Sequence, residues 1–459
     1  MTYTLSFIDW GIISAFLLIT FIIGLIERKK LTLDDYWVNN RKTNRWVLLA
    51  TLFSTFVGAG AILGNASIAF KGGGIAIIVI ALSFCFYFFI FGHFFAHKIK
   101  EYGDKHKFYS LPDWLEHRYS RKVGIMSSIV NLITYSLFLA LQILAIGVLV
   151  GAISDFSPVI STIIGASIVI IYTSIGGLRA DIRTDVFQAI VMLFLLTVLL
   201  PVAIFKGGGI GAISSLPSSF LTGQEFAPWY VFVLAFLFVG ASTLSSSDIW
   251  QRAYAADTQK NARWASRVSS ILVLLFLGMG TLLGIYGKII LPNAEANSVV
   301  FDLLFNLLPP VFIGFVVAGF FAAIMSSADT MLLITSMTVL HDIYYKSTKK
   351  KPSQEELLKK TRWATLIIGI LSLIISLIIF DIAHLSIEAV TFSVVLIPTI
   401  VFGFYWKRAN SKAAFWSILL GMLTVIGFMF IDPVQAFIPG TIVSFVVFIL
   451  VTKFTKKED

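Results

Sequence analysis

Long apolar stretches separated by short polar segments recur along almost the whole chain of 459 residues. Each has roughly the twenty residues that an α-helix needs to cross a bilayer, and none shows the ten-residue alternation of a membrane β-barrel. The pattern predicts an all-α polytopic membrane protein with about thirteen transmembrane helices in a single domain, residues 1–459. The expected spans are 5–26, 46–70, 75–97, 124–152, 157–177, 184–205, 228–249, 266–290, 310–340, 363–380, 384–405, 413–431 and 436–452.

The composition supports a membrane protein and its charge pattern predicts an orientation. Only 13% of the residues are charged and 58% are hydrophobic, whereas soluble domains are about one quarter charged. Nearly all of the 35 Lys and Arg residues lie in alternate loops between the expected spans, starting with the loop after 5–26, or in the C-terminal tail. Only Lys71, Lys206 and Lys288 lie in the other loops. Basic residues favour cytoplasmic loops. We therefore expect a multi-pass plasma-membrane protein with its N-terminus outside and its C-terminus cytoplasmic, and no nucleic-acid partner despite a net charge of +10.

The span 310–340 carries an unusual group of polar residues. Ala323, Ser326 and Ser327 share one small, oxygen-bearing helix face. Such a face suits coordination of a hard cation, or close helix packing with the hydroxyls bonded to their own backbone. Asp329 follows in the same span, and an ionisable group inside a membrane is costly and usually functional.

Two other spans contain interruptions rich in glycine and hydroxyl residues. One is 54–64, with Gly58 and Gly60, and the other is 239–247. Glycine also serves close helix packing, but these interruptions occupy equivalent positions if residues 46–205 and 228–405 are two five-helix repeats. An odd number of helices makes the second repeat inverted, with 5–26 as an extra N-terminal helix and 413–452 as two extra C-terminal helices. Paired interruptions in inverted repeats indicate a transporter's binding site.

The first interruption and the span 310–340 are expected to meet in mid-membrane. At 1.5 Å per residue, Ser54 to Val57 lie about 12–17 Å from the cytoplasmic end of their helix, and Ala323 to Ser327 about 20–25 Å from theirs. Backbone oxygens freed at the break and two hydroxyls together make about five oxygens, which suits sodium.

Several stretches then resemble one family. They are Tyr172–Gln188 (YTSIGGLRADIRTDVFQ), the loop Gln251–Ala256 (QRAYAA), Ser326–Asp329 (SSAD) and the run ending at Gly64. Together they resemble the sodium:solute symporter family of proline, pantothenate, sugar and sialic acid carriers. The resemblance implies a leucine-transporter-like fold of two inverted five-helix repeats, a transporter rather than an enzyme, and Na⁺ as the coupling ion.

The resemblance also implies a sodium site. Its ligands would be the backbone carbonyls of Ser54, Val57 and Ala323 and the hydroxyls of Ser326 and Ser327.

Two carboxylates are candidates for a second sodium ion or a release relay. Some relatives place an ion between the helix hydroxyls and the carboxylate that matches Asp185, but Asp185 could equally favour the positive end of a helix that it opens. Asp329 points about 60° from Ser326 and 160° from Ser327 on a helical wheel. We therefore expect it to bond a neighbouring helix or to assist ion release.

The substrate region departs from the sugar and sialic acid carriers. Phe56, Gly58 and Ala61 stand where those relatives have polar residues, and sugar hydroxyls would lack partners there. A small amino acid or organic acid is favoured over a sugar. The candidate solute contacts, each of which could instead be a packing residue, are Gly58, Gly60, Ala61, Ser83, Gln142, Gly240, Ser242, Thr243 and Thr391.

The sequence thus predicts a symporter that couples sodium to import of a small organic solute by alternating access. Two alternatives remain. One is a proton-coupled carrier that uses Asp185 or Asp329, and the other is a membrane module that senses solute. An intramembrane enzyme is disfavoured because the spans contain no nucleophile–base pair or metal motif.

Overall fold

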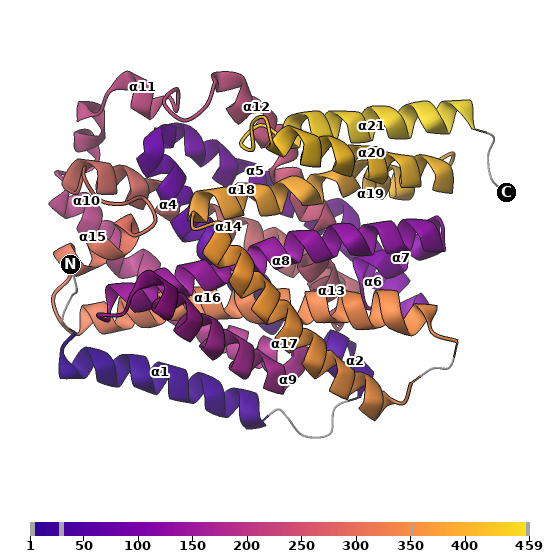
Figure 1. Ribbon diagram of the computed structural model, residues 1–459, viewed down its shortest axis with the longest axis horizontal. Coiled ribbons are helices and arrows are strands. Elements are labelled where there is room, and N and C mark those ends of the chain that lie inside the picture. The colour runs from indigo at the N-terminus through magenta and orange to yellow at the C-terminus, as the bar shows by residue number, and fades with distance from the viewer. Residues whose placement is uncertain (1–4, 27–31, 350–351, 456–459) are drawn as a thin grey trace.

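A computed structural model describes residues 5–26, 32–349 and 352–455 as a bundle of helices (Figure 1). The first part contains α1 (Phe7–Ile26), α2 (Leu33–Val38), η1 (Asn39–Arg41), α3 (Arg45–Phe56), η2 (Gly60–Gly64), α4 (Asn65–Ile68), η3 (Ala69–Gly73), η4 (Gly74–Ile77), α5 (Ile78–Ile90), η5 (Phe91–Phe95), α6 (Ala96–His106), α7 (Leu111–Arg118), α8 (Arg121–Ala152) and α9 (Pro158–Phe194). The rest contains η6 (Leu195–Leu199), α10 (Leu200–Lys206), η7 (Ile210–Ser215), α11 (Ser218–Leu221), α12 (Trp229–Phe238), η8 (Gly240–Ser245), α13 (Ser247–Ala255), α14 (Gln259–Ile290), α15 (Val299–Leu307), α16 (Phe312–Met337), η9 (Thr338–Tyr345), α17 (Gln354–Ile378), α18 (Ile382–Ser393), η10 (Val394–Leu396), α19 (Ile397–Tyr405), α20 (Ser411–Met429) and α21 (Phe437–Phe454).

The prediction of a polytopic helical membrane protein is confirmed. Among the described residues, ten helices are long and apolar enough to cross a membrane, or eleven if the bent pair Trp229–Ser245 and Ser247–Ala255 is one span. This count does not establish thirteen crossings. The expected loop between residues 177 and 184 is helical instead, because α9 runs from Pro158 to Phe194. Within this helical stretch and its continuation through η6 and α10, Pro158–Ile171 and Ala180–Lys206 are two separate apolar segments.

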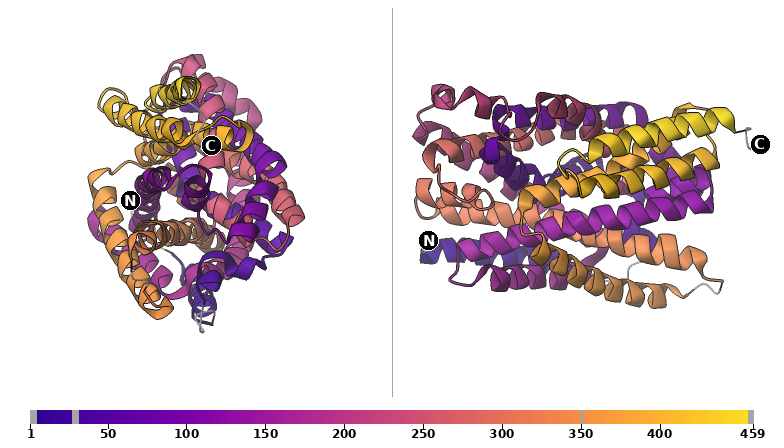
Figure 2. Two further views of the ribbon diagram at one scale, coloured as in Figure 1. Left: turned by 90° about the vertical axis from the view of Figure 1, so that its right-hand side faces the viewer. Right: turned by 45° about the horizontal axis from the view of Figure 1, so that its top comes forward.

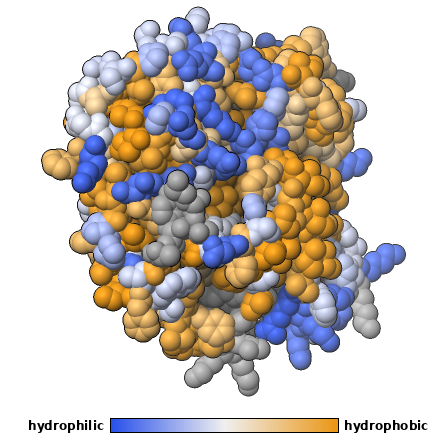
Figure 3. All heavy atoms as spheres, turned by 60° about the vertical axis from the view of Figure 1, so that its left-hand side comes forward, coloured by the Kyte–Doolittle hydropathy of each residue, from blue (hydrophilic) through white to orange (hydrophobic). Residues whose placement is uncertain are grey.

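The surface fits a bilayer. Large apolar side chains such as Leu18 of α1, Ile370 of α17 and Leu423 of α20 are exposed. Figure 3 shows broad areas of hydrophobic residues, with the hydrophilic ones gathered in patches. In a bilayer these exposed apolar side chains contact hydrocarbon chains rather than water.

Helix α16 is the centre of the bundle, and it packs against α1, α3, α8, α9 and α17 (Figures 1 and 2). Nearly every residue from Ile313 to Met337 is buried. Small residues permit this close packing. A Cβ on Gly319, for example, would lie 2.9 Å from the Leu195 side chain.

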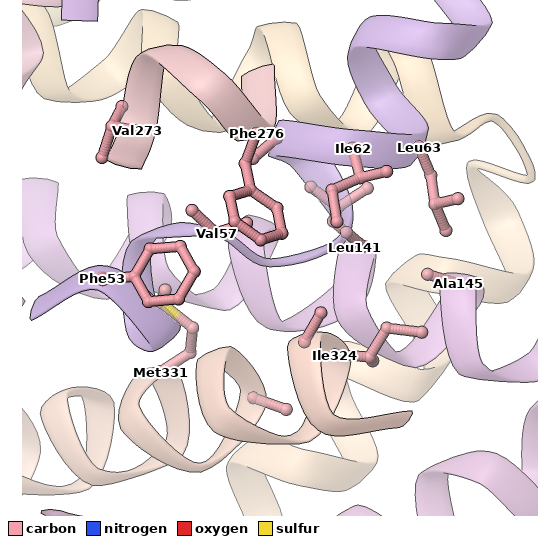
Figure 4. Close-up of a cluster of buried hydrophobic side chains, with 14 of the residues drawn as sticks. Phe53, Val57, Ile62, Leu63, Leu141, Ala145, Val273, Phe276, Ile324 and Met331 are labelled. Atoms are coloured by element: carbon pink, nitrogen blue, oxygen red, sulfur yellow. The ribbon is translucent and has the colours of Figure 1, made fainter. Parts of the chain in front are cut away.

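Both predicted interruptions are present. Helix α3 ends at Phe56, and Val57 leaves helical geometry with φ −85° and ψ 63° before the chain continues into η2. The second break runs through η8 to Ser246, which is extended, and the two parts of this span meet at 45°. Figure 4 shows Phe53 and Val57 at the first break packed among Phe276 of α14, Ile324 and Met331. This hydrophobic packing holds the irregular backbone between other helices.

The segment 251–256, expected to be a loop, is instead the end of the buried helix α13 up to Ala255. Arg252 is therefore not a cytoplasmic loop charge, and its side chain is 0% exposed.

The packing of α14 against α4 yields a stability prediction. A Cβ on Gly284 would lie 2.2 Å from the backbone oxygen of Ala66, which cannot move without shifting α4. We expect Gly284→Ala to lower the free energy of unfolding by about 1–3 kcal/mol, measured as a lower melting temperature of the purified protein in detergent.

Gly278 on the same helix provides the control, because a Cβ there meets nothing within 4 Å. Gly278→Ala should leave the melting temperature unchanged or raise it slightly, since alanine favours helix. Equal melting temperatures for the two variants would contradict the described contact.

Candidate functional site

The first helix break meets the hydroxyls of α16, as the sequence predicted. Ser326 Oγ donates a hydrogen bond to the Ser54 carbonyl oxygen at 2.7 Å and lies 3.3 Å from the Ala323 oxygen. Ser327 Oγ lies 3.2 Å from that same Ala323 oxygen. Ser54, Ala323, Ser326 and Ser327 thus form one cluster of neutral oxygens, and all four residues are buried.

Val57 is placed differently from the other expected ligands. The carbonyl that accepts from Ser327 Oγ, at 2.7 Å, belongs to Thr55, a residue that the sequence analysis did not name. No hydrogen bond between Val57 and these hydroxyls is found among the described residues. The Val57 side chain lies in the hydrophobic cluster of Figure 4.

The break depends on glycine and on a buried amide. A Cβ on Gly58 would lie 2.3 Å from Ser327 Oγ and 2.9 Å from Gln142 Nε2, so a larger residue would push the two elements apart. Gln142 Oε1 accepts the backbone N–H of Ala59 at 3.0 Å. An unsatisfied N–H would be costly at this depth, so Gln142 stabilises the irregular backbone.

The oxygen cluster has the chemistry of a site for a hard monovalent cation. Carbonyl and hydroxyl oxygens are suitable ligands, and each hydroxyl keeps lone pairs while it donates its proton. The cluster of Ser54, Thr55, Ala323, Ser326 and Ser327 contains no formal charge, which fits Na⁺ better than a divalent ion. The donor set therefore fits the ion implied by the sequence resemblance.

A buried arginine lies next to this cluster. The guanidinium of Arg252 is 3.0 Å from Asp181 Oδ2 and 3.3 Å from Asp185 Oδ2, both on α9. It also donates to three threonine hydroxyls, Thr51 at 2.9 Å, Thr55 at 2.6 Å and Thr330 at 2.7 Å. One side chain of α13 thereby joins α3, α9 and α16.

Sequence reasoning missed Arg252 and Asp181. Arg252 was counted among cytoplasmic loop charges. The available signal was the spacing of Asp181 and Asp185, since carboxylates four residues apart share one helix face and need a cation when buried.

The surroundings of Asp185 correct one of its two interpretations. Asp185 lies well inside α9, so it does not open a helix. It bonds to Thr51 and to Arg252. No described hydrogen bond links it to Ser326 or Ser327, and the cation beside it is the protein's own guanidinium.

Asp329 bonds to a neighbouring helix. Its Oδ1 accepts from the Thr173 hydroxyl of α9 at 2.5 Å, and its Oδ2 is buried without a hydrogen-bond partner. Asp329 thus adds a third buried carboxyl group beside Asp181 and Asp185, the two that pair with Arg252. Full ionisation of all three would leave uncompensated charge inside the membrane, which is costly.

A cavity of about 160 Å³ lies between the two helix breaks. Six of the expected solute contacts line it, namely Gly58, Gly60, Ala61, Gln142, Ser242 and Thr391. The Thr391 hydroxyl, however, donates to the Ile387 oxygen of its own helix at 2.7 Å. Asp248 and Tyr135, which sequence reasoning did not single out, also line the cavity.

The three other expected solute contacts are placed elsewhere. Ser83 Oγ donates to the Phe236 oxygen at 2.6 Å and accepts the Gly240 N–H at 3.1 Å. Ser83 and Gly240 therefore join α5 to η8, and they are packing residues outside the described lining of the cavity. Thr243 is also buried outside that lining.

A second polar cluster ties α7 to the end of the α16 span. Asp113, His341 and Asp342 have the ligand types of a metal site, but Lys346 Nζ already lies 2.5 Å from Asp113 Oδ1. Burial alone would raise the pKa of Asp113, but the charges of His341 and Lys346 hold it below its usual value. The cluster therefore acts as an internal ion pair.

Sequence comparisons with known proteins indicate one family. The family model described as "Sodium:solute symporter family" (SSF) matches residues 36–421. The sodium/pantothenate symporter of Haemophilus influenzae is 26% identical over 413 residues, which cover 85% of this chain and 83% of that protein. The osmoregulated proline transporter of Bacillus subtilis is 25% identical over 376 residues, covering 76% and 74%.

A solved structure shows the same fold. It is described as the substrate-bound, outward-open state of a Na⁺-coupled sialic acid symporter, and it matches with a TM-score of 0.83 and 19% identity over 99% of both chains.

The arginine cluster yields a prediction on stability. Arg252→Gln leaves Asp181 and Asp185 buried without their cation, so we expect the free energy of unfolding to fall by about 3–5 kcal/mol. The melting temperature in detergent measures this loss. Adding Asp181→Asn and Asp185→Asn should recover most of it, because the unpaired charges are then removed.

Arg408 is exposed and serves as the control site. Arg408→Gln should change the melting temperature little, since surface charges contribute little to stability. If Arg252→Gln were as stable as Arg408→Gln, Arg252 would not be the buried counter-charge.

Proposed function

The chain belongs to the sodium:solute symporter family, and we propose that it imports a small organic solute together with sodium by alternating access. The members of this family are multi-pass membrane transporters rather than enzymes, and their coupling ion is Na⁺. The observation that carries the proposal is the contact of the Ser54 and Thr55 carbonyls with the Ser326 and Ser327 hydroxyls.

Sodium would bind at that contact. The proposed ligands are the oxygens of Ser54, Ala323, Ser326 and Ser327. The backbone carbonyl of Val57 is included because the family resemblance implies it. Thr55 is added because its carbonyl faces Ser327. An ion there would tie α3 to α16 across the first break.

The solute would bind in the cavity between the two breaks, which is lined by Gly58 from the first and Ser242 from the second. Sodium and the solute then stabilise the same conformation, so the binding of one raises the affinity for the other. We propose a small amino acid or organic acid rather than a sugar, because Phe56, Gly58 and Ala61 offer sugar hydroxyls no side-chain partners.

The number of crossings, the repeats and the orientation in the membrane are also proposed. We propose thirteen crossings, inverted repeats at 46–205 and 228–405, an outside N-terminus and a cytoplasmic C-terminus. Helix α1 begins and α21 ends at opposite ends of the bundle (Figure 1), which agrees with an odd number of crossings.

Proton coupling is the second candidate, and one observation favours it. Asp181, Asp185 and Asp329 are three buried carboxyl groups for one guanidinium, so a carboxyl that gains and loses a proton could carry the coupling charge.

Uptake into liposomes separates the two functions. We expect solute uptake by the reconstituted protein to follow an inward sodium gradient and to continue when the pH is equal on both sides. Uptake driven by a pH gradient in sodium-free buffer would instead establish proton coupling.

Substitution of the two serines tests the sodium site. Ser326→Ala and Ser327→Ala should each abolish sodium-driven uptake, because each removes a hydroxyl ligand while the carbonyls remain. Binding of sodium, measured as the rise in melting temperature between KCl and NaCl, should fall with uptake.

Ser336→Ala is the matched control, since Ser336 lies on the same helix, is buried and its hydroxyl donates to the Leu333 carbonyl of that helix. It should retain uptake. Sodium dependence like that of the unmodified protein in both Ser326→Ala and Ser327→Ala would refute the site.

A further inference from the structure

Asp248 is the charged group of the cavity. It is the second residue of α13, directly after the second helix break. Of the described residues that line the cavity, it is the sole one with a formally charged side chain. Asp248 is 5% exposed, so its carboxylate is almost entirely withdrawn from solvent.

Two contacts fix the carboxylate in place. The Tyr135 hydroxyl of α8 donates to Asp248 Oδ1 at 2.5 Å, and the same hydroxyl oxygen accepts the backbone N–H of Asp248 at 3.1 Å. One residue earlier, Asn131 Nδ2 donates to Ser247 Oγ at 2.6 Å. The start of α13 is therefore held against α8, and the carboxylate cannot swing away from the cavity wall without breaking these bonds.

The described residues give Asp248 no ion-pair partner of its own. The charge of Arg252, one turn further along α13, reaches Asp248 through space. The guanidinium itself, however, forms its ion pairs with Asp181 and Asp185. A buried carboxylate that shares a distant counter-charge with two others is costly.

We propose that the transported solute provides this counter-charge: it carries a positively charged nitrogen that binds Asp248. This inference rests on the proposed transport function and specifies the solute of that same cavity. It separates amino acids and organic amines, which carry such a nitrogen, from organic acids that lack one.

The rest of the lining fits an organic cation better than a metal ion. Aromatic side chains, among them Phe56, Phe84, Phe138 and Phe232, supply much of the wall. The faces of such rings attract organic cations. A bare divalent cation needs six or more oxygen ligands, and the described side-chain hydrogen bond of the Asp248 carboxylate brings it one, the Tyr135 hydroxyl. An organic anion would meet the Asp248 carboxylate and no described cation.

A structural role for Asp248 makes a different prediction. A carboxylate in the first turn of a helix interacts favourably with the helix N-terminus whatever the cavity contains. In that case the substitution Asp248→Asn would change stability and leave solute selectivity unaltered. Selectivity is therefore the property to measure.

The experiment uses matched solutes that differ in the charged nitrogen. The pairs are L-proline with cyclopentanecarboxylate, and choline with its uncharged carbon analogue 3,3-dimethylbutan-1-ol. Melting temperatures of the purified full chain and uptake into liposomes are measured with each solute, in NaCl and in KCl. We expect at least one nitrogen-bearing member to act at concentrations about 30-fold or more below its partner, as for loss of a buried charge partner.

Asp248→Asn should weaken the effective solute by a similar factor while the stabilisation by sodium alone is retained. Asp248→Glu, which keeps the charge, should recover part of it. Asp302→Asn is the control, because Asp302 also lies in the first turn of a nine-residue helix, α15, and does not line the cavity. It should leave the solute preference unchanged.

Each failure points to one hypothesis. Sodium-dependent uptake in which both members of each pair act equally, or in which Asp248→Asn matches the unmodified protein, overturns the role of Asp248 and leaves symport intact. Selective uptake that is equal in NaCl and KCl overturns sodium symport instead. If no nitrogen-bearing member stabilises the protein or is transported, the inference is also overturned. Should Asp248→Asn fail to fold, the difference between the two members of each solute pair, measured on the unmodified protein, still tests whether the solute needs a charged nitrogen.

Discussion

The structure depends on the contact between a broken helix and the hydroxyls of α16. A break frees backbone carbonyl and N–H groups, and a membrane interior provides no water to satisfy them. Here Ser326 and Ser327 donate to the carbonyls of Ser54 and Thr55, and Gln142 accepts the N–H of Ala59. The irregular backbone is therefore stable only while α16 and α8 stay against it. The same oxygens that satisfy the break are those that a sodium ion would use.

Buried charge imposes a second constraint on the same region. Arg252 reaches from α13 to carboxylates of α9 and to threonines of α3 and α16. Because the hydroxyl of Thr55 bonds to Arg252 and its carbonyl accepts from Ser327, one residue belongs to both networks. A movement of α3 relative to α16 would change ion contacts and charge pairing together. Such a shared residue is a physical route by which ion binding can bias the whole bundle.

The second break places charge at the solute cavity. The chain bends by 45° between η8 and α13, and Asp248, directly after this bend, lines the cavity. The two breaks consequently have different chemistry. The first provides neutral oxygens suited to a small inorganic ion, and the second provides a carboxylate among aromatic rings. Thr55 and Ser327 of the proposed ion site also line the cavity, so the ion and the solute would bind side by side.

The amino-acid sequence was enough to predict the membrane class, the two interruptions and the proximity of Ser54 to Ala323, Ser326 and Ser327. These follow from hydrophobic length, from glycine and hydroxyl content and from helical spacing, all of which are local along the chain. The bonding partner of each polar residue, by contrast, follows from how distant helices pack. The sequence predicts Arg252 as a loop charge, whereas it is a buried counter-ion, because a window of sequence cannot show that α13 is buried against other helices. Ser83 was expected at the solute and instead packs on Gly240, while Asp248 was not singled out at all. A polar side chain has the same sequence pattern whether a neighbouring helix or a ligand satisfies it, and only the packing of distant segments distinguishes the two.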